Sequence, residues 1–184
     1  MKLEDLEIDG ARLITPDRIE DSRGFLSEAW RAGTVRHRGT DVQFVQDNHA
    51  YSPLKGTVRG LHFQLAPMAQ GKLTRVTRGA IFIVAVDLRG SSPTYGRHVS
   101  AVLSWKNWTQ LWVPGEFAHG YCTLEPETDV VYKVSAHFDP NLARGILWDD
   151  PGLGIRWPVG DATAIVSDRD RRQPRLSEIS PPFP

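Results

Sequence analysis

The run from Arg59 to Gln64, Arg-Gly-Leu-His-Phe-Gln, places an ionisable histidine, His62, in the middle of a segment typical of a β-strand. Histidine has an ordinary pKa of about 6.5, so it can take up and release protons near neutral pH. A lone histidine on a half-buried strand is nevertheless more often a core residue with satisfied hydrogen bonds than a catalyst. Its interpretation therefore depends on the chemically active residues elsewhere in the chain.

Three further groups complete a set that suits proton transfer: Lys72, Tyr132 and the carboxylates in the run Val166 to Asp170. Proton abstraction next to a carbonyl needs a base, a cation or donor that stabilises the enolate, and a second acid that returns the proton from another direction. Each residue also has a structural interpretation. Lys72 could extend from a strand end into water, and Tyr132 could be a core residue with one satisfied hydroxyl.

A metal site is the main alternative, because two histidines spaced two positions apart on a strand form a chelate. Gln64 stands where the second imidazole would be, so only His62, His119 and Glu116 remain for a non-haem iron oxygenase. The sequence has no glycine-rich phosphate loop and no Gly-x-Ser-x-Gly motif, and Cys122 lacks the cationic neighbourhood of an activated thiolate. These features argue against kinase and hydrolase functions.

The elements that position these residues are predicted to be short β-strands, because 16 glycines and 13 prolines separate short apolar or alternating segments. No segment keeps a helical period, so helix should be minor, with one turn near residues 29–35. Consecutive strands without intervening helices predict an all-β sandwich, jelly roll or small barrel within a single domain, residues 1–184, on which an irregular tail packs from residue 139 onward. The predicted strands span residues 24–30, 42–48, 57–64, 72–77, 80–88, 98–103, 110–113, 118–124 and 129–135.

Strict alternation along residues 57–64 places Gly60, His62 and Gln64 on one face of the strand and Arg59 on the other. Arg59 can therefore share a site with His62 only under one of two conditions. Either Gly60 marks a β-bulge, or Arg59 lies at the mouth of the barrel.

Overall composition limits the expected partners and location. Lys plus Arg and Asp plus Glu both number 22, the net charge is zero, and a nucleic-acid partner is not expected. The longest apolar run, residues 80–86, is far shorter than the roughly 20 residues that span a membrane, and the acidic start does not suggest a signal peptide. The single cysteine cannot form an intrachain disulfide, which favours the reducing cytoplasm.

Eight motifs in a fixed order give a sharper indication than any single residue. They are Asp21-Ser22-Arg23-Gly24-Phe25, Gln46-Asp47-Asn48, the run from Arg59 to Gln64, Gln70-Gly71-Lys72-Leu73, Val86-Asp87-Leu88-Arg89, Phe117-Ala118-His119-Gly120, Val131-Tyr132-Lys133 and Trp148-Asp149-Asp150-Pro151. In these motifs, from about residue 3 to residue 176, the chain resembles the dTDP-4-dehydrorhamnose 3,5-epimerase family. The resemblance implies a metal-free and cofactor-free cupin, which is a β jelly roll, and a homodimer whose N-terminal strands exchange between subunits.

The resemblance also implies a role for each matching residue. His62 would be the base that removes the protons at C5 and C3 of the sugar, and Asp170 would hold and charge-balance its imidazole. Tyr132 would be the acid on the opposite ring face, and Lys72 would stabilise the enolate at O4. The remaining matches would contact substrate: Arg23 and Glu28 in the partner's site, Gln46, Asp47 and Asn48 along the nucleotide, and Arg59, His119 and Arg169 around the sugar and diphosphate.

The implied reaction converts dTDP-4-dehydro-6-deoxy-D-glucose to dTDP-4-dehydro-L-rhamnose, a step toward dTDP-L-rhamnose for surface polysaccharide. Three departures from the family pattern bear on nucleotide preference rather than on chemistry. Arg169 stands where lysine is common, Ala143 where glutamate is frequent, and Phe138 where tyrosine is frequent. The alternatives are an epimerase that acts at C3 or C5 alone, the iron oxygenase, and a nucleotide-sugar-binding module without catalysis.

Overall fold

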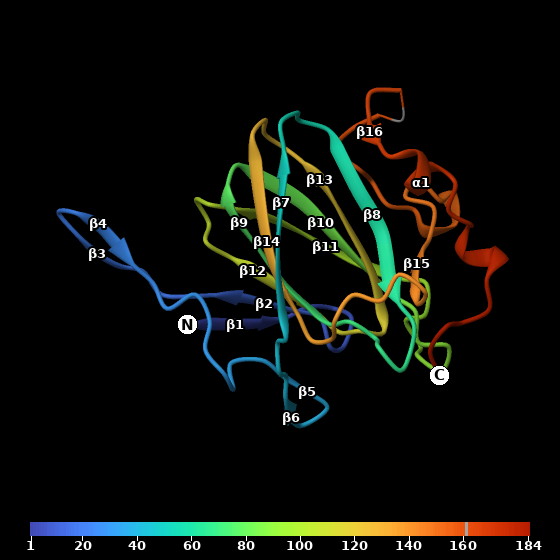
Figure 1. Cartoon of the computed structure of the whole chain (residues 1–184), viewed down its shortest axis with the longest axis horizontal. Helices are drawn as coiled ribbons and strands as arrows, with labels where there is room; N and C mark the ends of the chain where they lie inside the picture. The colour runs from blue at the N-terminus through green and yellow to red at the C-terminus, as the bar shows by residue number, and fades with distance from the viewer. Residues whose placement is uncertain (161) are drawn as a thin grey trace.

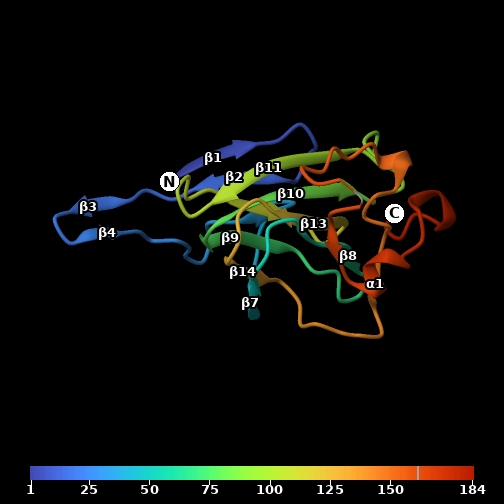
Figure 2. The ribbon, with the colours of Figure 1, turned by 90° about the horizontal axis from the view of Figure 1, so that it is seen from above.

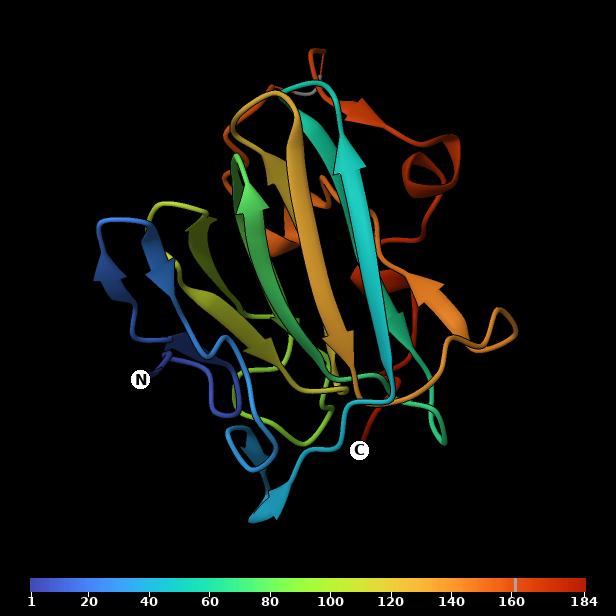
Figure 3. The same ribbon diagram turned by 60° about the vertical axis from the view of Figure 1, so that its left-hand side comes forward.

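Two six-stranded sheets lie face to face in the computed structural model, which describes residues 1–160 and 162–184 (Figures 1 and 3). The first sheet has the order β1 (Lys2–Asp5), β2 (Arg12–Thr15), β12 (Gln110–Val113), β9 (Lys72–Arg78), β14 (Thr128–Val134) and β7 (Gln46–Ser52). The second has the order β11 (His98–Ser104), β10 (Ala80–Asp87), β13 (Phe117–Thr123), β8 (Thr57–Gln64) and β15 (Ala143–Gly145), with β16 (Ile165–Val166) parallel to β8. This two-layer arrangement is the predicted jelly roll.

Smaller elements lie outside the two sheets. Two short hairpins are formed by β3 (Ile19–Asp21) with β4 (Gly24–Leu26) and by β5 (Arg36–His37) with β6 (Thr40–Asp41). The helical elements are the α-helix α1 (Asp168–Arg171) and the 3-10 turns η1 (Pro151–Leu153) and η2 (Leu176–Glu178).

The hydrophobic core lies between the sheets, and strand β10 shows how it is built. Ile83 points inward and belongs to the same buried cluster as Val76 of the facing sheet. Val84 points outward, where Leu153 and Phe183 of the C-terminal segment cover it. Burial on both faces explains why β10 is a continuous apolar run instead of an alternating one. The predicted packing of the tail on the barrel is confirmed.

A β-bulge interrupts the pairing of β8 with β13. His119 pairs with His62, and Tyr121 pairs with Arg59, so the single residue Gly120 faces an extra residue on β8. At the bulge Gly60 has φ +142°, and a Cβ there would lie 2.5 Å from the Cα of Gly120. Only glycine fits this close approach with this backbone conformation. The bulge turns Arg59 and His62 toward one cavity, as one of the two predicted conditions requires.

The β3–β4 hairpin stands away from the two sheets (Figures 1 and 2). Its apolar side chains are open to solvent, with Ile19 72% and Leu26 73% exposed. Pairs of exposed apolar side chains on a projecting ribbon are typical of a segment that contacts another chain.

Seven of the nine predicted strands are present within one residue at either end, and the other predictions in the N-terminal part need correction. Residues 29–35 form an isolated turn and no helix, since Gly33 adopts φ +83°, outside the helical region. The strand predicted at 24–30 ends at Leu26, and the one predicted at 42–48 begins at Gln46. Val42 and Phe44 are apolar because they pack over Trp112 on the outside of the first sheet.

Candidate active site

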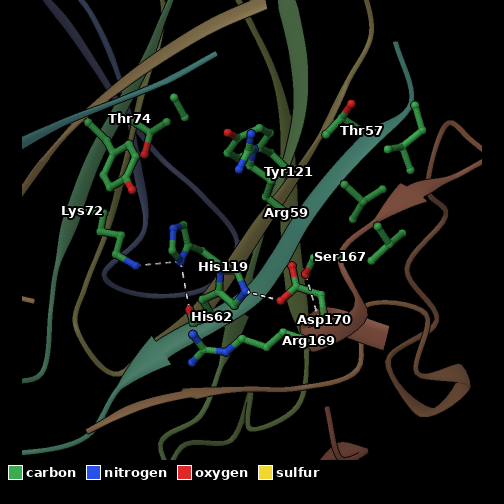
Figure 4. Close-up of a pocket in the computed structure, with 15 residues that line it drawn as sticks. Thr57, Arg59, His62, Lys72, Thr74, His119, Tyr121, Ser167, Arg169 and Asp170 are labelled. Carbon is green, nitrogen blue, oxygen red and sulfur yellow. Dashed lines mark hydrogen bonds and ion pairs between the residues drawn. The ribbon is translucent and has the colours of Figure 1, made fainter. Parts of the chain in front are cut away.

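The central cavity has a volume of about 510 Å³ and is lined by residues from both sheets and from α1 (Figure 4). Strand β8 contributes Arg59 and His62, β9 contributes Lys72, and β14 contributes Tyr132. Asp170 enters from α1. The fold therefore brings together the four residues to which the family resemblance assigned the chemistry.

His62 and Asp170 form the closest polar pair in this cavity, with 2.7 Å between Nε2 and Oδ1. The other carboxylate oxygen of Asp170 accepts a hydrogen bond from the Gly60 amide at 3.3 Å, and the Asp170 amide donates to Ser167 Oγ at 3.1 Å. Burial would raise the pKa of Asp170, but the hydrogen bonds and charge of its partners outweigh burial and lower it. Asp170 is thus an ionised carboxylate that orients the imidazole and leaves Nδ1 for a bound molecule.

Lys72 is buried, and desolvation lowers the pKa of its amine from 10.5 to about 7. The Nζ atom of Lys72 lies 3.3 Å from Nδ1 of His119. Nδ1 of His119 in turn lies 3.0 Å from the backbone oxygen of His62. Burial and the nearby charge of Lys72 hold the pKa of His119 well below 6.5, so this imidazole is neutral. Nδ1 of a neutral ring either donates to the His62 carbonyl or accepts from Lys72, so His119 connects Lys72 to the backbone of His62.

Tyr132 faces His62 from the opposite sheet. Burial raises the pKa of its phenol, and the Arg59 guanidinium opposes that shift. Arg59 is held by a hydrogen bond of 3.2 Å from Nη2 to the backbone oxygen of Tyr51 and by a weaker one of 3.5 Å from Nε to Ser52 Oγ. A proton acceptor and a proton donor therefore lie on opposite walls of one cavity, with a cation-bearing side chain beside them.

A side cavity of about 300 Å³ adjoins the central one through His62, Lys72, Tyr132 and Arg169, which line both. Its other walls are mostly polar or aromatic: Gln46, Asn48, Gln64, Gln70, Phe138 and Arg144. Ala143 lies there too. The side cavity could hold a planar, polar group attached to a molecule whose reacting part occupies the central cavity.

A profile of the family described as dTDP-4-dehydrorhamnose 3,5-epimerase matches residues 5–178 of the sequence. The chain belongs to this family. The epimerase of that name from Sinorhizobium fredii is 50% identical over 183 residues, which cover 100% of this chain and 93% of the relative. The family resemblance read from the eight motifs is thus confirmed.

Two crystal structures of this epimerase family resemble the whole chain. The dTDP-4-dehydrorhamnose 3,5-epimerase from Bacillus anthracis, with TDP and PPi bound, is 44% identical with a TM-score of 0.90, over 95% of this chain and 99% of that one. The dTDP-6-deoxy-D-glucose-3,5-epimerase from Legionella pneumophila, in complex with dTDP-4-keto-L-rhamnose, is 38% identical with a TM-score of 0.89. That match covers 97% of this chain and 94% of the Legionella chain.

Not all residues that the family resemblance singled out lie at the central cavity. Asp47 points to the opposite face of β7, where Lys133 contacts it at 3.0 Å, because successive side chains of a strand alternate. Glu28 and Asp47 line an outer cavity of about 590 Å³ on the far face of the first sheet. Arg23 lies at the tip of the projecting hairpin and pairs with Asp21 at 2.6 Å. The roles predicted for Arg23 and Glu28 concern a partner subunit and stay predictions.

Four polar residues of the central cavity were given no role by the sequence reasoning: Thr57, Thr74, Tyr121 and Ser167. Alternation offers a signal for two of them, since Thr74 follows Lys72 by two positions and Tyr121 follows His119 by two. The signal for Ser167 is its spacing to Asp170, because a serine followed three positions later by an acidic residue marks a helix start. Its side chain does cap α1.

The iron site considered for the same histidines does not assemble in this epimerase fold. Glu116 contacts Arg38 at 3.1 Å and His37 at 3.5 Å instead of turning toward His62. Within residues 1–160 and 162–184, no three His, Cys, Asp or Glu side chains converge as metal ligands would.

Helices long and apolar enough to cross a membrane are absent from the part of the chain that the structure describes.

Proposed function

We propose that this chain catalyses epimerisation at both C3 and C5 of dTDP-4-dehydro-6-deoxy-D-glucose, giving dTDP-4-dehydro-L-rhamnose. The observation that carries the proposal is the placement of His62 and Tyr132 on facing sheets across one cavity. Inversion at a carbon requires a proton to leave one face and another to arrive on the opposite face, so it needs two groups on opposite walls. The names of the Sinorhizobium and Legionella relatives support the same substrate class.

The proton steps can be assigned to the side chains in the cavity. Nδ1 of His62 takes the proton from the carbon beside the keto group, and the ionised Asp170, 2.7 Å from Nε2, balances the imidazolium that forms. The electron pair of the broken C–H bond becomes part of an enolate, whose oxygen Lys72 stabilises. Tyr132 then gives its proton to the carbon from the opposite face, and the enolate returns to the ketone.

The diphosphate and nucleotide fit the remaining residues. Arg59 and Arg169 are the arginines that line the central cavity, and guanidinium groups suit the bidentate hydrogen bonds that phosphates accept. His119 is neutral, so it would contribute a hydrogen bond and no charge. Gln46 and Asn48 line the side cavity, where the nucleotide base would lie near Phe138.

Deuterium incorporation tests the reaction. In heavy water the purified protein should place deuterium at both C3 and C5 of the product, whereas label at one carbon would identify a single-site epimerase. The variant His62→Ala should lose exchange and inversion together, while the matched control His49→Ala, on the outer face of β7, should retain both. Full activity of His62→Ala, or activity that depends on stoichiometric iron, would refute the proposal.

We also propose that the chain is one domain that works as a homodimer with shared active sites. The projecting β3–β4 hairpin carries Arg23 and exposes Ile19 and Leu26, so it is available to another copy of the chain (Figure 2). Glu28 follows directly on the same segment. In a symmetric pair each hairpin would reach the site of its partner.

A mixing experiment tests the shared site. Arg23→Ala and His62→Ala homodimers should each have low activity, and a mixed dimer would contain one site with both native residues. After equal amounts are unfolded and refolded together, half of the dimers are mixed, so about a quarter of the wild-type activity should return. No recovery, although light scattering shows mixed dimers, would refute the exchange.

Cytoplasmic location is a further proposal, supported by a chain whose single cysteine, Cys122, is buried and free. Fractionation of cells that produce the protein would test it.

A further inference from the structure

The hydroxyl of Tyr121 is buried in the wall of the central cavity and has no assigned task. Tyr121 lies on β13, is 6% exposed and lines the cavity (Figure 4). Among residues 1–160 and 162–184 its hydroxyl has no hydrogen-bond partner. Buried hydroxyls are nearly always paired in proteins, because an unpaired one loses its bonds to water without replacement. The hydroxyl is therefore available to hydrogen-bond with a group in the cavity.

The polar groups around this hydroxyl belong to the proposed acid and its neighbour. Tyr121 is part of the buried cluster against which Tyr132 packs. The β8–β13 register places Tyr121 directly opposite Arg59. Burial raises the pKa of Tyr121 to about 12, Arg59 opposes this shift, and the Tyr132 phenol adds to it. Tyr121 thus stays protonated near neutral pH and can act only as a neutral hydrogen-bonding group.

From this placement we propose that Tyr121 is a positioning residue that acts through Tyr132: its hydroxyl donates a hydrogen bond to the Tyr132 oxygen once Tyr132 has released its proton. The inference rests on the proposed function, in which Tyr132 is the acid. When the Tyr132 O–H bond breaks, the enolate electron pair forms the new C–H bond on the sugar and a phenolate remains. Tyr121 keeps its own proton throughout, and the phenolate later regains one from solvent.

A buried phenolate needs both a nearby positive charge and a hydrogen-bond donor. Burial raises the pKa of Tyr132, which disfavours proton release, and Arg59 provides opposing charge. The titratable and charged groups that line the same cavity are Arg59 and His62 on β8, Lys72 on β9, His119 on β13, and Arg169 and Asp170 on α1. Several of these have tasks or partners, since His62 is bound to Asp170 and Lys72 contacts His119. The unpaired hydroxyl of Tyr121 is free to serve as the donor.

The variant Tyr121→Phe removes only the hydroxyl and keeps the ring in the core. We expect its rate of inversion to fall about 10- to 150-fold, the range for loss of a hydrogen bond to a charged acceptor. Deuterium exchange by His62 should continue within about twofold of wild type, because removal and return of a proton on one face does not use Tyr132. Without the donor the pKa of Tyr132 rises, so the alkaline limb of the kcat profile should move to higher pH.

Two controls separate this role from a structural one. Tyr95→Phe removes a hydroxyl outside the cavity and should leave exchange, inversion and pH profile unchanged. The melting temperature of free Tyr121→Phe should equal or exceed that of wild type, since the lost hydroxyl had no partner. Unchanged inversion and pH profile in Tyr121→Phe, or an equal loss of exchange and inversion, would overturn the inference. Failure of the proposed function would be visible in the wild-type protein as absence of deuterium at C3 and C5.

Discussion

Replacing Asp170 with asparagine tests whether the carboxylate behind His62 matters for proton abstraction. Asn has nearly the same shape, and its amide oxygen can still accept the hydrogen bond from the Gly60 amide. Its NH2 group then replaces the carboxylate oxygen that lies 2.7 Å from Nε2, so the negative charge is lost and Nε2 must accept a hydrogen bond, which leaves the imidazole proton on Nδ1. Loss of a hydrogen bond to a charged group alone costs about 1.5–3 kcal/mol, or about 10- to 150-fold in kcat, and the wrong tautomer should extend the decrease toward about 10⁴-fold. Partners lower the pKa of Asp170 below its ordinary value of 3.8. The wild-type carboxylate is therefore ionised from about pH 5 upward, and the deficit should persist across that whole range.

The assay follows both deuterium exchange and inversion, because Asp170 supports His62, the proposed base that starts each event. Both rates should fall together in Asp170→Asn, unlike the divergence expected for Tyr121→Phe. Asp168→Asn is the matched control, since Asp168 is an exposed residue of the same helix α1 and its side chain does not line the central cavity. A folded Asp170→Asn protein that keeps more than half of the wild-type kcat would refute the charge-balance argument.

Two further substitutions probe how the fold supports the site. Lys72→Met should lose most activity but raise the melting temperature at pH 6 more than at pH 9. Desolvation lowers the pKa of Lys72 in the folded protein to about 7, whereas the amine of the unfolded chain keeps the ordinary value of 10.5. The buried amine therefore destabilises the fold below pH 10.5, and this cost grows as the pH falls to about 7. An equal or lower melting temperature at pH 6, measured by calorimetry, would contradict this. Gly60→Ala should lower both stability and activity, because the new Cβ would lie 2.5 Å from the Cα of Gly120. In the control Gly154→Ala the new Cβ has no atom within 4 Å, and only the φ of +62° is unfavourable, so the free energy of unfolding should fall by only about 1–2 kcal/mol. Similar unfolding free energies for the two glycine variants in urea would show that crowding at the bulge is unimportant.

The sequence predicts a strand correctly where its apolar residues are apolar only because the sheet buries them. Strand β8 was placed at 57–64 and β12 at 110–113, and both have those bounds. The N-terminal part was harder because its apolar residues have a different cause. Val42 and Phe44 cover Trp112 from outside the sheet, and Ile19 and Leu26 lie on a hairpin that leaves the sheets. A local pattern cannot tell a residue that covers a sheet from one that belongs to a strand.

The residues of the site could be named from sequence, but their meeting could not be derived from it. His62 and Asp170 are 108 positions apart, and their contact depends on β16 lying parallel to β8 so that α1 begins beside Gly60. Tyr121 was overlooked because an aromatic residue in an apolar strand is usually core, and it is core here as well. Two features separate it from an ordinary buried tyrosine: it lines the central cavity, and its hydroxyl has no hydrogen-bond partner within residues 1–160 and 162–184.

The β-bulge at Gly60 determines which side chains reach the central cavity. In a regular strand Arg59 and His62 would point to opposite faces, and the cavity would contain the base without the guanidinium that opposes the rise in the pKa of Tyr132. The extra residue opposite Gly120 shifts the alternation along β8, so that Arg59 and His62 point to the same side. Gly60 also donates its backbone amide to Asp170. One backbone irregularity thus places the Arg59 guanidinium in the cavity and holds the carboxylate that orients His62, the proposed base. A Cβ at position 60 would lie 2.5 Å from the Cα of Gly120, so the position that serves both purposes admits only glycine.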